Sequence, residues 1–416
     1  MEPARIVQET LVALFGDTYG TAMGVRLWDG TRVEGSRQRF TLVVAHPGAL
    51  RTALRAPFDL SAGRAFAAGL LDCEGDIEAA VDALLNAVAG LTPRRAAHIW
   101  LMLRRLPRAR LARLREARLR GGLHSRARDL AAIGFHYDLP LPFYATFLDS
   151  HLIYSCAYYD DGLSNLETAQ LAKLDHTLRK LRLAPGERLL DIGCGWGALV
   201  IRAAQAFGAR ALGITLSRSQ YEEGNRRIDA AGLRRSASIE LRDYRDLGDE
   251  RFDKVASIGM FEHVGRAKLP EYFRAAYRAL RPGGLFLNHG IAAEGPAVGR
   301  RATSFMERFV FPDGELVRIA EALAVAQDAG FEVRDVENLR EHYARTLRAW
   351  VANLERHRTE AVDAAGEQSY RIWRLYLAGS AQGFRSARIA IYQSLLARPR
   401  GDGTVDLPPT RRDLYA

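Results

Sequence analysis

Cysteine is scarce in this sequence. The 416 residues include three cysteines, Cys73, Cys156 and Cys194, which lie far apart and form neither a CxxC pair nor a Cys/His cluster. An odd and scattered set of this kind argues against a disulfide framework and against a zinc site. We therefore expect no bound metal.

Long apolar runs are also missing. No uninterrupted apolar segment reaches the roughly 20 residues that a membrane-spanning helix needs. The first five residues lack the basic and then apolar pattern of a secretory signal. We expect a cytoplasmic protein that meets a membrane only peripherally.

Acidic residues are outnumbered by basic ones. The chain has 59 Lys and Arg against 49 Asp and Glu, which gives a formal net charge of +10. This excess favours an anionic partner, either nucleic acid or an anionic membrane surface, although a solvated arginine-rich surface gives the same charge. Charged residues at 26% and hydrophobic residues at 48% indicate an ordinary globular protein.

The positive charge is densest between residues 104 and 128. Ten arginines lie there beside one acidic residue, Glu116, and leucines interleave with them. A helix over this stretch, interrupted at Pro107, would bury an apolar stripe and turn a basic face outward. Such a helix suits the headgroups of an anionic bilayer, and a solvated linker would have the same composition.

The stretch 189–197 has the pattern of a cofactor-binding turn. An apolar run ends at Asp191 and Ile192, glycines follow at alternate positions, and helix-forming residues resume at Ala198. This pattern predicts a buried parallel strand, a tight turn and a helix N-terminus. Glycines there tolerate positive φ and let a ligand approach the backbone. Crowded strand-to-helix turns contain similar glycines, so the loop alone does not identify a cofactor.

From residue 187 onward, apolar strand-like runs alternate with helical patterns. This alternation predicts a mostly parallel, doubly wound α/β sheet, with its ligand beyond the carboxyl ends of the central strands. The first 90 residues are expected to mix helices and strands. Strands of the main sheet are expected near 188–193, 211–216, 237–241, 253–258, 284–289, 331–336 and 387–396. Helices are expected near 168–181, 197–207, 217–231, 268–280, 315–329, 343–356 and 366–384.

Polar residues follow several of these strands directly. Asp243 and Tyr244 come after the third strand and offer a carboxylate and an aromatic face to an adenine. Glu262 and His263 come after the fourth strand, and His289 ends the fifth. Burying ionisable groups costs several kcal/mol unless they are satisfied, so this grouping favours a polar catalytic pocket. No acidic residue follows the second strand, which argues against NAD.

Together these motifs resemble the cyclopropane fatty acid synthase and mycolic acid cyclopropane synthase family of S-adenosylmethionine-dependent methyltransferases. The resemblance implies a Rossmann-like class I methyltransferase fold, with a doubly wound sheet and a smaller N-terminal α+β domain. It implies an N-terminal lipid-association or accessory domain over 1–103, a basic linker over 104–129 and a catalytic domain over 130–416. The matching blocks are 154–158, 191–197, 213–217 with Gln220, 261–263, His289 with Ile291, and 342–347, while Gly69 and 74–76 resemble the N-terminal domain of the longer members.

The resemblance also implies roles for individual residues. S-adenosylmethionine is expected at Tyr154, Ser155, Asp191, Gly193, Gly195, Gly197, Thr215, Gln220, Asp243 and Tyr244, with the last two near the adenine. A bicarbonate ion, which the family holds beside the transferred methyl group, is expected at Cys156, Glu262, His289, Ile291 and Tyr343.

The activity implied by this resemblance is that of a cyclopropane-fatty-acyl-phospholipid synthase. Such an enzyme transfers a methylene group from S-adenosylmethionine to the cis double bond of an unsaturated phospholipid, with bicarbonate as the base. The alternative is a related lipid C-methyltransferase that makes a methylated or methylene-bearing acyl chain. We expect peripheral association with an anionic bilayer at the inner face of the membrane. The oligomeric state is open, with a homodimer among the options.

Two other classes of protein fit less well. An amino-methylating nucleic-acid methyltransferase carries an Asp/Asn-Pro-Pro-aromatic motif after the fourth strand, where this chain has residues 260–263, Met-Phe-Glu-His. We therefore expect no nucleic-acid partner. A lipid-binding protein without enzymatic activity would have no reason to keep the glycine loop together with Glu262 and His289.

Overall fold

The computed structural model describes residues 2–137, 139–160, 162, 165–295 and 304–414. By their internal contacts the residues form two compact units that do not follow chain order. The N-terminal unit contains Met1–Arg118, Arg301–Pro312 and Leu354–Gln382, and the catalytic unit contains Leu119–Arg300, Asp313–Asn353 and Gly383–Ala416. The first segment therefore ends inside the expected linker, and two later segments pack with it. The functional assignment of the expected domains stays a prediction.

The N-terminal unit is built on a small mixed sheet in the order β2-β1-β3-β4. Strands β1 and β3 are parallel, and the other two pairings are antiparallel. The expected mixture of helices and strands in the first 90 residues is thus confirmed. Its strands are β1 (Met23–Leu27), β2 (Arg32–Val33), β3 (Phe40–Val44) and β4 (Leu71–Gly75). Its first helices are α1 (Glu2–Phe15), α2 (Ala49–Ala53), α3 (Phe58–Ala67), α4 (Ile77–Ala89) and α5 (Pro93–Arg104).

Most of the arginine-rich stretch is not helical, so the helix, one of the two alternatives for it, is wrong. Helix α5 ends at Arg104, and residues 107–120 have no regular secondary structure. Pro107 cannot donate a backbone hydrogen bond and disfavours helix in the residue before it, and arginines at helical spacing repel one another. Within the N-terminal unit, the Glu116 carboxylate instead accepts two 2.8 Å hydrogen bonds from Arg64. The backbone N–H of Ala117 donates to the carbonyl of Arg308 at 2.7 Å.

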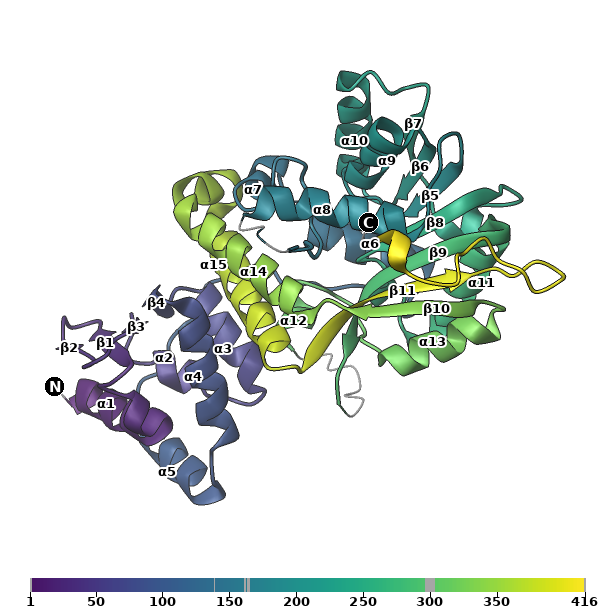
Figure 1. The fold of residues 1–416 in the computed structure, drawn as a ribbon. Coiled ribbons are helices and arrows are strands. Elements are labelled where there is room, and N and C mark those ends of the chain that lie inside the picture. Colours follow the sequence, from purple (N-terminus) through teal and green to yellow (C-terminus); the bar gives the residue numbers. More distant parts are fainter. Residues whose placement is uncertain (1, 138, 161, 163–164, 296–303, 415–416) are drawn as a thin grey trace. The chain divides into compact units, whose positions relative to one another are not determined.

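The catalytic unit contains the predicted sheet, with seven strands in the order β10-β11-β9-β8-β5-β6-β7 (Figure 1). The five strands from β9 to β7 are parallel, and β11 runs antiparallel to both β9 and β10. The strand order reverses between β5 and β8, which is where ligands bind in sheets of this kind. The strands are β5 (Arg188–Ile192), β6 (Arg210–Thr215), β7 (Ala237–Leu241), β8 (Phe252–Ile258), β9 (Leu280–Ala293), β10 (Glu332–Asn338) and β11 (Ile389–Ala397).

Helices cover both faces of this sheet and form a separate hydrophobic core on each. Helices α8, α9 and α10 pack on one face, and α11 and α13 pack on the other. Successive strand residues point to opposite faces, so Leu189 belongs to one core and Leu190 to the other. The expected helices are therefore confirmed within a few residues at most ends. They are α8 (Leu166–Lys180), α9 (Ala198–Phe207), α10 (Arg218–Ala230), α11 (Leu269–Ala279), α13 (Ile319–Asp328), α14 (Arg340–Arg356) and α15 (Arg358–Arg385).

Three short helices complete the described chain: α6 (Arg126–Tyr137), α7 (Leu141–Ala145) and α12 (Phe305–Phe309). None of the helices in the described ranges is long and apolar enough to cross a membrane.

Candidate active site

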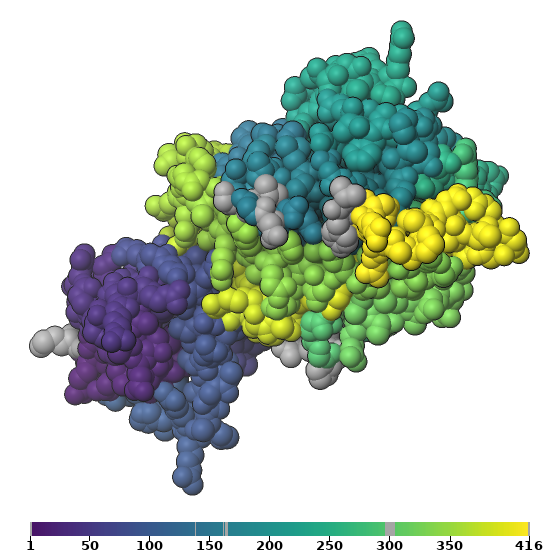
Figure 2. Space-filling model, viewed as in Figure 1, coloured from purple at the N-terminus to yellow at the C-terminus, as the bar shows by residue number. Residues whose placement is uncertain are grey.

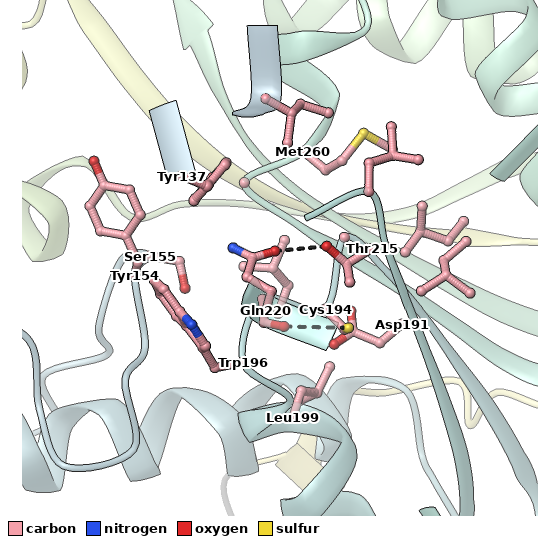
Figure 3. A pocket seen from close by; sticks show the side chains of 18 of the residues that line it. Tyr137, Tyr154, Ser155, Asp191, Cys194, Trp196, Leu199, Thr215, Gln220 and Met260 are labelled. Carbon is pink, nitrogen blue, oxygen red and sulfur yellow. Dashed lines mark hydrogen bonds between the residues drawn. The ribbon is translucent and has the colours of Figure 1, made fainter. Parts of the chain in front are cut away.

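A cavity lies at the carboxyl ends of the central strands of the catalytic unit. Its volume is about 1160 Å³, counted with the space that opens to solvent. The turns after β5, β6, β7 and β8 all contribute to its wall, so it occupies the place where the strand order reverses. Figure 3 shows Tyr154 and Trp196 on one side of the cavity and Thr215 and Asp191 on the other.

Most of the residues expected to hold S-adenosylmethionine line this cavity. Gly197 and Asp243 are the two exceptions among the ten. The structure therefore brings residues from four separate parts of the chain to one wall. The residues that line it are Tyr154, Ser155, Asp191, Gly193, Gly195, Thr215, Gln220 and Tyr244.

The three glycines of the turn after β5 have different tasks. All three have positive φ, between 54° and 83°. A Cβ atom on Gly195 would meet nothing within 4 Å, so this backbone is open on the cavity side for a ligand to approach. A Cβ atom on Gly197 would come within 2.7 Å of Ile239 Cδ1 on β7. Gly197 is therefore required by packing rather than by contact with a ligand.

The turn after β6 is fixed by its own hydrogen bonds. Thr215 Oγ1 donates to Gln220 Oε1 at 2.7 Å, the bond drawn in Figure 3. Ser217 is the N-cap of α10, and its hydroxyl accepts from the backbone N–H of Gln220 at 3.3 Å. These bonds hold the amide of Gln220 at the cavity wall before any ligand binds.

Two residues of α8 that the sequence analysis missed position the Tyr154–Ser155 turn. Gln170 Nε2 donates to the carbonyl of Ser155 at 2.9 Å, and Lys173 Nζ donates to Ser155 Oγ at 2.9 Å. Both side chains are buried, and Lys173 also lines the cavity. The sequence could have indicated that these two polar side chains are buried. Positions 170 and 173 lie at helical spacing on the same side of the helix as Leu166, Leu174 and Leu178.

Lys173 and Asp191 are ionisable groups in the same wall. Burial lowers the pKa of Lys173 to about 8, with the Asp149 and Asp191 carboxylates acting in the opposite direction. Burial raises the pKa of Asp191 to about 7, and Lys173 opposes that change. Asp191 is 3% exposed, and its Oδ1 has no hydrogen-bond partner among the described residues. A buried carboxyl oxygen without a partner in a cavity wall fits a polar or cationic ligand group.

The two residues expected near an adenine lie in different surroundings. Tyr244 lines the cavity, and its ring packs edge-on against Tyr272 with centroids 5.5 Å apart. Asp243 is instead held by Arg245, which donates to its two oxygens at 2.9 and 2.6 Å. Arg245 lines the cavity and also pairs with Asp129 at 3.1 Å. The sequence analysis did not single out Arg245, and no spacing signal marked it.

The five residues expected around bicarbonate lie outside the lining of this cavity. Three of them form one group next to it. The backbone N–H of Ile291 donates to Glu262 Oε1 at 2.6 Å, and His289 lies two residues earlier on β9. His289 pairs in register with Ile258, which does line the cavity. His289 therefore lies on the strand next to a residue of the cavity wall.

Glu262 and His289 each present a buried polar atom without a partner. Glu262 Oε2 and His289 Nε2 have no hydrogen bond within the described residues. Burial raises the pKa of Glu262 to about 7 and lowers the pKa of His289 well below its usual value, so the imidazole is neutral. Gln393 Nε2 lies 3.4 Å from His289 Nδ1. A donor at Nδ1 would leave the ring proton on Nε2, the atom that has no partner.

The other two residues of the set are Tyr343, which belongs to helix α14, and Cys156, which lies beside that helix. Cys156 is fully buried, and its neighbour Ala157 donates a backbone hydrogen bond to Thr346 Oγ1 at 3.1 Å. The ring of Tyr343 packs on Phe384 with centroids 4.6 Å apart. Burial raises the pKa of the Cys156 thiol, so it stays protonated and is unsuited to act as a thiolate nucleophile.

Comparison with known proteins identifies relatives of this site and its fold. The sequence profile of the family described as mycolic acid cyclopropane synthetase matches residues 124–394. A protein of Pseudomonas putida named "Probable fatty acid methyltransferase" is 42% identical over 403 residues, which cover 94% of this chain and 95% of that protein. The cyclopropane-fatty-acyl-phospholipid synthase of Escherichia coli is 36% identical over 263 residues, which cover 63% of this chain and 66% of that protein.

A solved structure has the same fold as the catalytic unit. Mycolic acid cyclopropane synthase CmaA1, complexed with SAH and CTAB, superimposes with a TM-score of 0.61 at 34% identity. The match covers 64% of this chain and 97% of that one.

Lys173 provides the first test of the cavity as a cofactor site. Replacing Lys173 by Met should raise the KM for S-adenosylmethionine about 10- to 100-fold, because the turn that carries Ser155 loses a charged hydrogen-bond donor. The measurement is steady-state kinetics with a thermal unfolding control. Ser155→Ala should have a smaller effect, and the double variant should be no worse than Lys173→Met alone. Additive losses would show that Lys173 does not act through Ser155.

Asp191 provides the second test, through pH. The carboxyl ionises near pH 7, so the affinity for the cationic cofactor should increase from about pH 6 to about pH 8, because the ionised form attracts the sulfonium. Asp191→Asn should weaken binding at pH 8 and remove this pH dependence in calorimetric titrations. A variant that kept the wild-type pH profile would assign the titration to another group.

The same substitution should stabilise the ligand-free protein. The folded pKa of Asp191 lies above its unfolded value, so the stability that it contributes is present at low pH and is lost as the pH rises toward 7. Asp191→Asn should therefore raise the free energy of unfolding at pH 8 by on the order of 1–3 kcal/mol, because it removes a buried carboxylate whose desolvation the charge of Lys173 offsets only in part. Urea unfolding at pH 5 and pH 8 measures this, and a gain at pH 5 as large as at pH 8 would contradict it.

Proposed function

Because this chain belongs to the mycolic acid cyclopropane synthetase family of S-adenosylmethionine-dependent methyltransferases, we propose that it acts on unsaturated phospholipids. The product is a cyclopropane ring, made by adding one carbon from S-adenosylmethionine across the cis double bond of an acyl chain. The observation that carries this proposal is the pair of unpartnered buried atoms, Glu262 Oε2 and His289 Nε2, beside the cofactor cavity.

The cavity fits S-adenosylmethionine. Gly195 leaves open backbone, Gln220 presents a fixed amide, and Asp191 presents an oxygen without a partner. When bound, the cofactor supplies an electrophilic methyl group on a cationic sulfur. The carboxyl of Asp191 would attract that positive charge, and the Lys173–Ser155 hydrogen bond would keep the facing turn in place.

The residues around His289 fit bicarbonate, which would supply the base that removes a proton from the new methyl group. An anion needs hydrogen-bond donors, and the neutral His289 offers Nε2–H. Glu262 has a pKa of about 7, and an adjacent anion would raise it further, so its carboxyl would be protonated and would also donate. Its other oxygen accepts from Ile291 N–H, which fixes its direction. Cys156 and Tyr343 enter this set through the family resemblance.

The rest of the wall suits a reaction that passes through a carbocation on the acyl chain. Leu152, Ile153 and Leu174 contribute apolar side chains that keep water away from the cation. The indole of Trp196 also lines the cavity, is 3% exposed, and could stabilise positive charge by about 1–2 kcal/mol.

A second product class is supported by a specific observation. The Pseudomonas putida relative is named as a fatty acid methyltransferase, and it matches nearly the whole chain. If the cation lost a proton from the acyl chain instead of closing, the product would be a methylated or methylene-bearing chain. The same residues would serve both reactions up to that step.

The acceptor lipid also implies a location. We propose that the enzyme works as a peripheral protein on an anionic bilayer, at the inner, cytoplasmic face of the membrane. The net charge of +10 supports an anionic surface as partner. A homodimer remains a prediction.

The products test the proposed function. Purified protein, S-adenosylmethionine, bicarbonate and unsaturated phospholipid vesicles should give a lipid heavier by one CH2, with upfield ring protons in the proton NMR spectrum. Omission of bicarbonate from degassed buffer is the control and should reduce turnover. The same mass gain with vinylic or methyl-branch signals would select the second product class, and no mass gain on any lipid would exclude both.

Glu262 tests the hydrogen-bond donor role through the pH profile. Glu262→Leu should reduce kcat by about 100-fold or more while S-adenosylmethionine still binds. Wild-type activity should fall only at a pH above 7, because burial raises the pKa of the carboxyl to about 7 and the adjacent anion raises it further, and the ionised carboxyl has lost the proton that it donates. Glu262→Gln keeps a donor at all pH values, so it should retain activity within about tenfold and lack this alkaline decline. If both proteins lost activity over the same pH range, Glu262 would not be the titrating group.

A further inference from the structure

We propose that the outer face of α5, together with the arginines that follow it, is the surface by which the N-terminal unit docks on an anionic phospholipid bilayer. The outer face is defined by Ala97, Trp100, Leu101 and Arg104, which are all exposed. The proposal rests on the proposed function, because it takes the acceptor to be a membrane lipid. It differs from the sequence-based expectation, which placed a helix over the arginines themselves.

Helix α5 has apolar residues on two sides, and only one side is buried. Ile99, Met102 and Leu103 are at most 8% exposed, and Met102 Sδ lies 3.9 Å from the hydroxyl of Thr10 on α1. Trp100 and Leu101 are 55% and 58% exposed. A large aromatic and a large aliphatic side chain are thus held side by side on the surface by a helix whose opposite side is anchored. Figure 2 shows the N-terminal residues in purple to blue at the molecular surface.

The charge around this face is predominantly positive, although Arg105 pairs with Glu2 of α1 at 2.9 Å. Residues 91–115 contain eight arginines and no acidic residue. The Arg104 guanidinium lies 4.7 Å from the centroid of the Trp100 ring, so a positive group and an aromatic face are presented together. Beyond α5, the extended segment adds the exposed side chain of Leu111 among Arg108, Arg110 and Arg113.

This combination matches the headgroup region of an anionic bilayer. Tryptophan is favoured at the membrane interface, leucine gains by entering the acyl boundary, and arginines bind lipid phosphates. A second copy of the chain is a poorer partner, because an isologous contact would place the same arginines against each other. Nucleic acid would complement the charge but would leave Leu101 and Leu111 in water.

Trp100 is a built-in probe for the first measurement. Trp196, Trp350 and Trp373 are at most 4% exposed, so vesicle contact should change mainly the emission of Trp100. With the full chain, vesicles of phosphatidylcholine containing phosphatidylglycerol should shift the emission to the blue, and brominated acyl chains should quench it. Trp100→Phe should remove most of the quenching, whereas Trp28→Phe, at a partly exposed site, should not. Quenching that survives in Trp100→Phe would overturn the proposal.

Vesicle sedimentation with matched variants is the second measurement. Trp100→Ser with Leu101→Ser should weaken binding to the anionic vesicles at least tenfold. The control is Val12→Ser with Phe58→Ser, which removes two apolar side chains, 49% and 46% exposed, from α1 and α3 of the same unit. Binding of the wild type should be weak on pure phosphatidylcholine and should fall at 0.5 M salt, as expected from screening of the arginines. Equal binding by both double variants, or no vesicle binding by the wild type, would overturn the proposal.

Activity assays separate this proposal from the proposed function. The Trp100/Leu101 double variant should keep wild-type turnover on phospholipid dispersed in detergent micelles and lose turnover on vesicles. If no lipid is methylated but vesicle binding still depends on Trp100 and Leu101, docking stands and the proposed function fails. If the double variant changes the oligomeric state or nucleic-acid binding while vesicle binding is unchanged, another partner covers this face and docking on lipid is wrong.

Discussion

Charge buried at the carboxyl edge of the catalytic sheet is the constraint on which the site depends. Lys173, Asp191 and Glu262 are 2%, 3% and 8% exposed, and burial moves the pKa of each toward neutrality. Such groups destabilise a fold unless it is otherwise well packed, and they cluster where chemistry is done. Asp191 lies near the end of strand β5, Glu262 follows strand β8, and Lys173 reaches the same edge from α8. The sheet itself lies between two hydrophobic cores, which hold this edge in place.

Helix α8 connects this packing to the cofactor turn. Its buried side includes Leu166, Leu174 and Leu178, and the same side carries Gln170 and Lys173. Their side chains hold Ser155 through its carbonyl and its hydroxyl, on the side of the cavity that faces the glycine turn. Helix α8 thereby becomes part of the site, because two of its buried polar residues contact the Tyr154–Ser155 turn.

The N-terminal unit differs from the catalytic unit in its fold. The family match begins at residue 124, beyond the arginine-rich segment. The residues before this match form a small sheet with helices. Helix α5 exposes two large apolar side chains, Trp100 and Leu101. The basic segment after α5 is held by hydrogen bonds of Glu116 and Ala117. The residues that we propose for the reaction lie in the catalytic unit, and the surface that we propose for membrane docking lies in the N-terminal unit.

The sequence by itself determined the α/β alternation, the strands and helices of the catalytic unit, and most of the cofactor wall. These are local properties, because hydrophobic periodicity, glycine spacing and the residues that directly follow each strand can be recognised from short stretches of sequence. Two further segments, 301–312 and 354–382, pack with the N-terminal unit, and no local pattern marked them. The absence of a helix over 107–120 also depended on contacts, because Arg64 and Arg308 offer that segment partners that a helix would forgo.

Only the tertiary structure decided which polar residues reach the cavity and whether they are protonated. Lys173 and Arg245 reach the cavity because α8 and the turn after β7 pack beside it, and Asp243 turns from the cavity toward Arg245. The neutral His289 and the raised pKa of Glu262 follow from burial. The burial of a side chain depends on all the atoms around it, most of them distant in sequence. A sequence motif can therefore identify a candidate residue, but it does not determine whether that residue is charged.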